Sequence, residues 1–282
     1  MSKTEPDSCT ERPASGQGVY LYCFARCTVA GRIEATGVYD HTEVTSLTVG
    51  EVAAVFSRVS MGDFIGPSGD ANLRDASWIV PRARQHEQVV EEVMHLSPVL
   101  PARFGTVLSS TSILERLAAK NAETIRQFLE RMVNLEEWSV KAFLDVPKAE
   151  GWLLRSPAAL DETAAGQGPV SPGVRYIQGK RLRAHVLRRL EESSRQTAEE
   201  VGRALAAHAV DVCPLRPQSK GASGRDGKMI LNCALLLLKD RVAELREGAS
   251  EIEARYADRG LSLNISGPWP PYSFCPAVLD VE

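Results

Sequence analysis

The sequence predicts an α+β protein of two domains, of which the C-terminal one is ferredoxin-like (βαββαβ) and the N-terminal one is a smaller α+β unit. Three observations support this. The chain has 282 residues, which exceeds one average domain. Segments that alternate apolar and polar residues, as strands do, are interspersed with segments of helical periodicity. In the second half these segments follow the order strand, helix, strand, strand, helix, strand, which is the ferredoxin-like order.

The N-terminal domain is expected over residues 18–135, after a disordered polar tail at 1–17. It opens with residues 19–25, which are aromatic or apolar throughout and typical of a buried strand. Residues 61–71 are rich in Gly, Pro and Asp and predict a loop. Further short strands are expected at 37–39, 44–49 and 52–59.

Two helices and one strand complete the predicted N-terminal domain. The first helix, at 77–95, has apolar residues at helical spacing and ends before Pro98, because the residue before a proline is disfavoured in a helix. Residues 99–108 resemble a single strand, and 112–133 form the second predicted helix.

The C-terminal domain is expected over residues 136–266. Its final strand alternates apolar and polar residues, and we expect Gly267-Pro268 to end it because proline has no N–H. Residues 156–174 and 218–228 lack periodicity and are predicted to be a mobile loop and a flexible connector. Strands are expected at 138–145, 210–215, 229–239 and 261–266, and helices at 175–208 and 240–257.

Residues 267–282 form an aromatic, proline-rich tail that we expect to pack back on the N-terminal domain. Trp269, Tyr272 and Phe274 are carried on a stiff backbone, and we interpret Trp269 as a buried interdomain wedge. The alternative is a partner-binding surface, because rigid aromatic rings are typical interface anchors. Arg103, beside Phe104, is an isolated cation among apolar residues; a buried ion pair is the preferred interpretation and a groove-facing cation the alternative.

Composition narrows the class of protein. The chain is 44% hydrophobic and 24% charged, which is ordinary for a globular protein. Its formal net charge of −3 argues against a nucleic-acid partner. No apolar run is long enough to span a membrane, and no secretory signal is visible, so we expect a cytoplasmic protein without a membrane partner.

Catalytic and metal-binding patterns are missing from the sequence. None of the common hydrolase, zinc or phosphate-loop motifs occurs, and the six cysteines form no C-x-x-C pair. His86 and His95 are nine positions apart on one predicted helix, and we interpret each histidine as a surface residue. The glycines of residues 221–228 have the wrong spacing for a phosphate loop. We therefore expect no catalytic residue, no metal and no cofactor.

One long helix carries a segregated charge pattern. Basic residues are gathered within three turns and acidic ones follow them. A solvated helix face is the preferred interpretation, and a docking patch for an acidic partner is the alternative. The residues are Lys180, Arg181, Arg183, Arg188 and Arg189, followed by Glu191, Glu192, Glu199 and Glu200.

Four segments together resemble a known family. They are Gly267-Pro268-Trp269-Pro270-Pro271-Tyr272-Ser273-Phe274, Tyr20-Leu21-Tyr22, Pro98 to Thr106, and Glu137-Trp138-Ser139-Val140-Lys141. Over about residues 18–276 the chain resembles the gas vesicle protein GvpL/GvpF family, and the proline-rich aromatic segment is the most specific match. Ala102 departs from the larger apolar residue that the family often has there.

The resemblance implies a non-enzymatic accessory protein, a minor component of gas vesicle formation in the cytoplasm. Its implied partners are the hydrophobic gas vesicle shell protein, whose aggregation it would limit during nucleation, and other gas vesicle accessory proteins. Arg103, Phe104, Trp269, Tyr272 and Phe274 are the candidate residues for partner binding or interdomain contact. The alternatives are a small-molecule or nucleotide-binding enzyme that uses residues 218–228, and a purely structural vesicle component.

Overall fold

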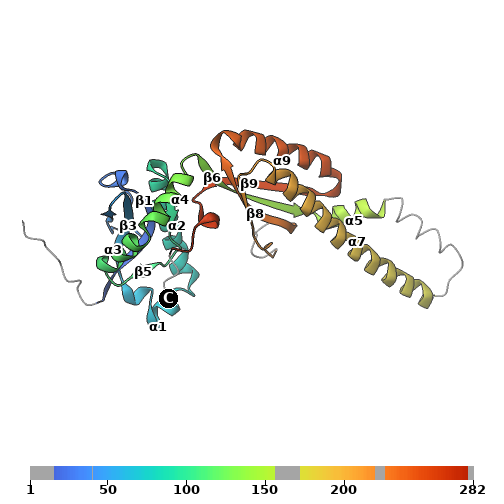
Figure 1. The fold of residues 1–282 in the computed structure, drawn as a ribbon. Coiled ribbons are helices and arrows are strands. Elements are labelled where there is room, and N and C mark those ends of the chain that lie inside the picture. The colour runs from blue at the N-terminus through green and yellow to red at the C-terminus, as the bar shows by residue number, and fades with distance from the viewer. Residues whose placement is uncertain (1–15, 40, 156–171, 220–225, 279–282) are drawn as a thin grey trace, which may run out of the picture. The chain divides into compact units, whose positions relative to one another are not determined.

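The computed structural model describes residues 16–39, 41–155, 172–219 and 226–278. The expected tail at 1–17, loop at 156–174 and connector at 218–228 lie wholly or partly outside these ranges. The chain folds as two compact units (Figure 1). Unit 1 contains Met1–Val133 and Pro270–Glu282, and unit 2 contains Asn134–Trp269. In the described ranges, no helix has both the length and the apolar character that crossing a membrane requires.

Unit 1 is built on an antiparallel sheet in which β1 is the central strand. The order is β2-β3-β1-β4, and β5 pairs with the other end of β1. Eight consecutive residues of β1 are buried, so both faces of the sheet are covered, as its uninterrupted apolar sequence predicts. The strands are β1 (Gln17–Arg26), β2 (Val44–Val49), β3 (Val52–Ser60), β4 (Val99–Pro101) and β5 (Val107–Leu108).

Two expected strands of unit 1 are wrong in detail. Residues 37–39 form no strand, and only an isolated bridge joins Thr36 to Glu43. Residues 99–108 are two strands, because the chain turns between Pro101 and Val107. Gly105 has φ +83° in that turn, a left-handed conformation that favours glycine.

Helices cover the sheet of unit 1. α2 places Val89, Val90 and Val93 against the face that carries Tyr20 and Tyr22, and α3 and α4 contact the strands as well. The helix expected at 112–133 is divided at Asn121, and the loop expected at 61–71 contains a short helix. The bounds are α1 (Gly66–Asn72), α2 (Ala76–Leu96), α3 (Thr111–Lys120) and α4 (Ala122–Arg131).

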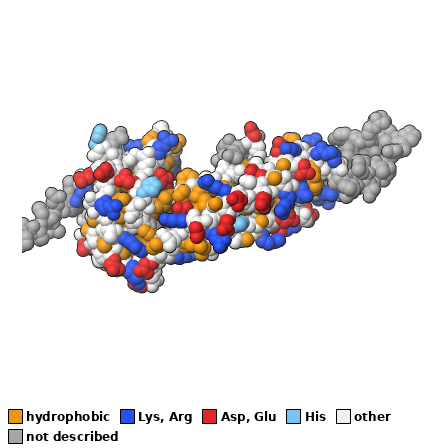
Figure 2. All heavy atoms as spheres, turned by 90° about the horizontal axis from the view of Figure 1, so that it is seen from above, with side chains coloured by type: hydrophobic (Ala, Val, Ile, Leu, Met, Phe, Trp, Pro, Cys, Tyr) orange, Lys and Arg blue, Asp and Glu red, His pale blue; other side chains and the backbone are white. Residues whose placement is uncertain are grey.

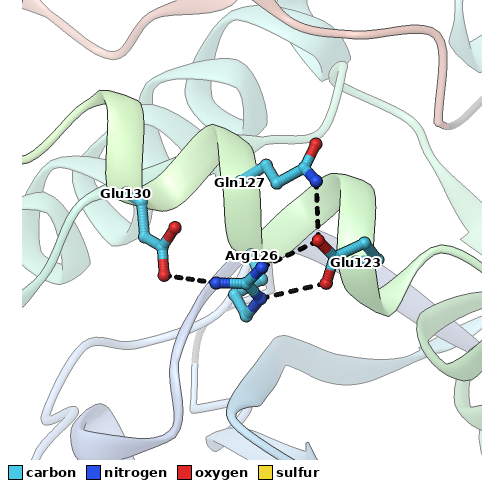
Figure 3. A network of polar contacts seen from close by, with 4 residues as sticks. All are labelled: Glu123, Arg126, Gln127 and Glu130. Atoms are coloured by element: carbon cyan, nitrogen blue, oxygen red, sulfur yellow. Dashed lines mark hydrogen bonds and ion pairs between the residues drawn. The ribbon is translucent and has the colours of Figure 1, made fainter.

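On the exposed side of α4, one arginine pairs with two glutamates of the same helix. Arg126 bonds to Glu123 at 2.7 Å and to Glu130 at 2.5 Å, and Gln127 also donates to Glu123 (Figure 3). The partners are three or four residues apart, which places them side by side on a helix surface. This mutual pairing makes the face a poor candidate for a functional site.

Unit 2 has the predicted ferredoxin-like arrangement. Its antiparallel sheet has the order β7-β8-β6-β9, so its first and third strands are central, and α7 and α9 pack on one face (Figure 1). One helix, α5, was not expected, because no helix was assigned between the strand at 138–145 and the loop at 156–174. Proline is well tolerated in the first helical turn, and the Asp145 carboxylate caps that turn by accepting from the Lys148 N–H.

Apart from α5 and the end of β9, the bounds of the unit 2 elements follow the sequence pattern closely. They are β6 (Leu135–Leu144), α5 (Val146–Leu154), α7 (Pro172–Ala206), β7 (Asp211–Pro214), β8 (Lys228–Leu238), α9 (Val242–Tyr256) and β9 (Leu261–Trp269).

Candidate functional site

The first candidate site lies inside unit 1 around His86. Asp75 caps α2 by accepting from the Ser77 N–H, and the apolar stripe of this helix faces the sheet. His86 belongs to that stripe and is fully buried. The expectation that His86 is a surface residue is therefore wrong, because its position along α2 turns the side chain toward the sheet together with the apolar residues of the stripe.

Hydroxyl and carbonyl groups satisfy both ring nitrogens of His86. Its Nδ1 lies 3.0 Å from the Tyr20 hydroxyl, which accepts from the Gly105 N–H. Its Nε2 lies 3.1 Å from the Ala102 carbonyl oxygen and 3.1 Å from the Tyr272 hydroxyl. A carbonyl oxygen only accepts, so the proton is on Nε2, and the Tyr20 hydroxyl donates to Nδ1.

Burial sets the protonation states in this cluster, which we call the His86 cluster: Tyr20, His86, Glu87, Ala102 and Tyr272. It lowers the pKa of His86 to about 4, so the imidazole is neutral at pH 7. It raises the pKa values of Tyr20 and Tyr272, so both remain hydroxyls. It also raises the pKa of Glu87, whose carboxylate accepts from the Tyr272 hydroxyl at 3.0 Å.

The His86 cluster holds chain segments together and is poorly suited to catalysis. Both nitrogens of the imidazole already have partners, so neither is available to a substrate as an acid or a base. Within the described residues, no group of three or more His, Cys, Asp or Glu side chains could hold a metal ion. The cluster instead joins β1, α2, the turn after β4 and the C-terminal segment of unit 1.

Four of the five candidate residues from the sequence lie in unit 1. Phe104 is partly buried and packs edge-on against Tyr20 and His86. Tyr272 and Phe274 belong to a 3-10 helix, Tyr272–Phe274, and both are partly buried. Arg103 is exposed and makes no ion pair with any described residue. A buried pair for Arg103 is therefore wrong, because this residue lies in a turn that follows β4 and not in a strand.

Trp269, unlike the other four, belongs to unit 2. It is the last residue of β9 and pairs with Glu137 of β6. The strand does not end at Gly267-Pro268 as expected, because these two residues form a bulge opposite Trp138 and pairing resumes after it. Its indole N–H donates to the Ser266 hydroxyl. Trp269 is therefore part of the unit 2 sheet, and its role as a buried interdomain wedge stays a prediction.

The second candidate site is a groove in unit 2, which we call the α7–β8 groove. It has a volume of about 610 Å³. Small residues four positions apart on α7, Ser194, Ala198 and Gly202, form one wall. Met229 to Cys233 of β8 lie at its base, and Val212, Pro214 and Pro217 form the opposite wall. The surface offered to a ligand is mostly apolar, with charged residues of α7 at its margin.

The sequence reasoning missed this groove. The small residues at positions i, i+4 and i+8 of the long helix were a detectable signal, since they mark a helix face that leaves room for close approach. A second signal was the pair of prolines, Pro214 and Pro217, beside an apolar strand.

The edges of the unit 2 sheet are poorly disposed to add a further strand. At the β7 edge the Val212 N–H donates to the Asp211 carboxylate, and Pro214 has no N–H. At the β9 edge the Leu263 N–H donates to the Glu253 carboxylate. Two donors at the β7 edge and one at the β9 edge are therefore missing or occupied, which weakens both edges as sites for strand addition.

Comparison with known proteins places these features in context. Residues 18–276 match the family described as "Gas vesicle synthesis protein GvpL/GvpF". The chain is 31% identical to "Gas vesicle protein L" of Streptomyces sp. (strain CB03234) over 228 residues, 80% of each chain. It is 25% identical to "Gas vesicle protein L2" of Halobacterium salinarum over 98% of each chain. The crystal structure of GvpF from Anabaena sp. PCC7120 has the same fold, with a TM-score of 0.65, 18% identity, and coverage of 92% of this chain and 96% of that one.

Proposed function

This chain belongs to the GvpL/GvpF family of gas vesicle synthesis proteins, and from that premise we propose that it binds the hydrophobic gas vesicle shell protein and limits its aggregation during vesicle nucleation. The protein takes part in gas vesicle formation. The proposed action is non-enzymatic and takes place in the cytoplasm, before and while the shell assembles. It needs no cofactor, and other gas vesicle accessory proteins are further partners.

The observation that carries the proposal is the α7–β8 groove. A shell subunit that lines a gas space has apolar surface, and this surface aggregates in water until it is covered. The groove offers an apolar base lined by helix α7 on one side and by two prolines on the other, and the proline rings restrict the backbone that a docking segment would have to order. Its aliphatic base residues are the kind of surface that an apolar segment would bury.

Docking into the groove fits the structure better than strand addition. Strand addition relies on main-chain donors and acceptors along a sheet edge. The side chain of Asp211 and the ring of Pro214 remove two donors at the β7 edge, which is the edge beside the groove. Side-chain burial in the groove needs none of these donors. The proposal therefore assigns recognition to apolar contacts.

Co-expression of the shell protein with variants of this chain tests the proposal. Ala198→Leu places a larger side chain in the groove, and Ala204→Leu makes the same change at an exposed position of the same helix. The parent chain and Ala204→Leu should raise the amount of shell protein that stays in solution and the yield of vesicles. Ala198→Leu should lose most of that effect while keeping the circular dichroism of the parent.

Two results would count against this assignment. If Ala198→Leu supports vesicles as well as Ala204→Leu, the groove is not the docking site. If the shell protein is equally soluble with and without the chain, the anti-aggregation role fails. Antibody labelling of washed vesicles separates a transient factor from a structural component. Full-length variants are preferable to isolated halves, because cutting the chain near residue 135 would remove Pro270–Glu282 from unit 1.

A further inference from the structure

Helix α7 has a strongly uneven charge distribution that the groove does not use. Residues 172–190 contain six Lys or Arg residues and no Asp or Glu. Residues 191–206 contain four Glu and two Arg. The formal net charge of the whole chain is −3, so the first half of α7 is a basic region in an otherwise acidic protein. Basic side chains are visible over the α5 and α7 part of unit 2 in Figure 2.

Three cations of the first half of α7 are exposed and make no ion pair with the residues that the structure describes. Lys180, Arg183 and Arg188 are exposed, and none of them makes an ion pair within the described ranges. The ion pairs seen on α7 lie in its second half, where Arg195 contacts Glu192 and Glu199. The acidic half is thus partly neutralised by Arg195, whereas no such pairing is found for Lys180, Arg183 and Arg188 in the described ranges.

Helix stability does not account for this arrangement. Lys180 and Arg183 are three positions apart, and like charges at this spacing destabilise a helix. An anionic partner would offset this repulsion, since Lys180 and Arg183 would then each gain an opposite charge.

An exposed leucine lies on the same face as these cations. Lys180, Arg183 and Leu187 are at positions i, i+3 and i+7, which share one side of a helix, and Arg188 is beside them. Leu187 is 47% exposed. The neighbouring helix α5, which packs on α7 through Leu153 and Leu190, ends with Leu154, which is 44% exposed, and Arg155.

We propose that Lys180, Arg183, Leu187 and Arg188, named here the basic α7 surface, dock an acidic amphipathic segment of a partner protein. The cations would pair with carboxylates, and Leu187 would enter the apolar stripe of the segment. A bilayer is a poorer fit, because a helix that lies in a membrane interface needs a broad apolar face and this one has a single exposed leucine. A nucleic acid is a poorer fit, because the acidic remainder of the chain repels an extended polyanion.

Fluorescence anisotropy with a labelled synthetic helix, Glu on one face and Leu on the other, tests the proposal. The full chain should bind it, and binding should weaken as salt is added. Lys180→Glu, Arg183→Glu and Arg188→Glu together should weaken binding by about tenfold or more, since three exposed ion pairs are replaced by repulsions. A matched control makes the same change in charge at three exposed positions of unit 1 and should leave peptide binding unchanged. Its substitutions are Arg84→Glu, Arg116→Glu and Lys120→Glu. Leu187→Ala should also weaken binding, whereas Leu238→Ala, at another exposed leucine, should not.

Three results would overturn the proposal. The first is that the two charge-reversed proteins bind the peptide equally well. The second is that the chain binds duplex DNA or phosphatidylglycerol vesicles more tightly than the peptide. The third is that the chain forms a dimer that only the α7 reversals dissociate. The outcome is separable from the proposed shell-protein function. Ala198→Leu should retain peptide binding, and the α7 reversals should leave the α7–β8 groove intact.

Discussion

His86 and Tyr272 are 186 positions apart in the sequence, and His86 Nε2 lies 3.1 Å from the Tyr272 hydroxyl. Between them the chain leaves unit 1, forms all of unit 2 and returns. The same hydroxyl donates to Glu87, the residue next to His86. This pair of contacts anchors the C-terminal segment in unit 1.

Tyr272→Phe should lower the free energy of unfolding of unit 1 by about 1–2 kcal/mol, because it leaves the half-buried Glu87 carboxylate without the Tyr272 donor. Tyr20→Phe should cost more, because it deprives both His86 Nδ1 and the Gly105 N–H of a partner. Urea unfolding of the two variants checks this order. Equal stability of Tyr272→Phe and the parent would show that the anchor contributes nothing.

Acid should destabilise unit 1 through His86. The pKa of His86 is about 4 in the folded protein and near 6.5 when unfolded, so the unfolded state binds the proton first as the pH falls. The contribution of His86 to the free energy of unfolding is fully present above pH 6.5. It declines by about 1.4 kcal/mol per pH unit toward pH 4, which amounts to a loss of about 3 kcal/mol.

Glu87 acts in the opposite direction, because its pKa is raised and the folded state takes up its proton first, so the net decline is smaller. His86→Gln should flatten the decline of stability between pH 6.5 and 4, as measured by urea titrations across this range. An unchanged slope in His86→Gln would assign the pH dependence to other groups.

Gly202→Ala should stabilise unit 2 by about 0.5–1 kcal/mol, because glycine inside a helix is entropically costly. The added Cβ would meet the Leu231 side chain at 3.6 Å, an ordinary contact. Thermal unfolding should therefore shift to a higher temperature. A lower melting temperature would mean that the wall of the α7–β8 groove does not tolerate a methyl group.

Gly267→Ala should destabilise unit 2 by about 2–3 kcal/mol. Gly267 has φ +150°, and a Cβ there would lie 2.9 Å from the Trp138 ring and 3.0 Å from the Glu137 carbonyl oxygen. Gly31→Ala is the matched control: its φ is +70° but nothing lies within 4 Å of the added Cβ, so only about 1 kcal/mol should be lost. Similar losses in the two variants would exclude crowding at Trp138 as the cause.

Arg103→Ala should change the stability of unit 1 by less than about 0.5 kcal/mol, since the side chain is exposed. Chemical denaturation measures this directly. A loss of several kcal/mol would restore the idea of a buried ion pair. Arg103→Ala therefore distinguishes the two interpretations that the sequence left open.

Local patterns along the chain were sufficient for most of the fold. Apolar residues at every second position identified β6 and β9, and helical spacing identified α2, α7 and α9, because each pattern is produced by the element's own contact with a core. The order of these elements then indicated the ferredoxin-like unit. The Gly-Pro-Trp-Pro-Pro-Tyr segment pointed to the family, which the comparisons showed.

Long-range packing settled what those patterns left open. The helical phase of His86 placed it on an apolar stripe, but no local signal named Tyr20, Ala102 and Tyr272 as its partners, since they come from three distant segments. The place of Trp269 in β9 likewise depends on a bulge against Trp138, and the α7–β8 groove depends on the path of Pro214 and Pro217 beside β8. Periodicity shows which side of an element faces inward, whereas the identity of its neighbours is set only when separate elements pack together.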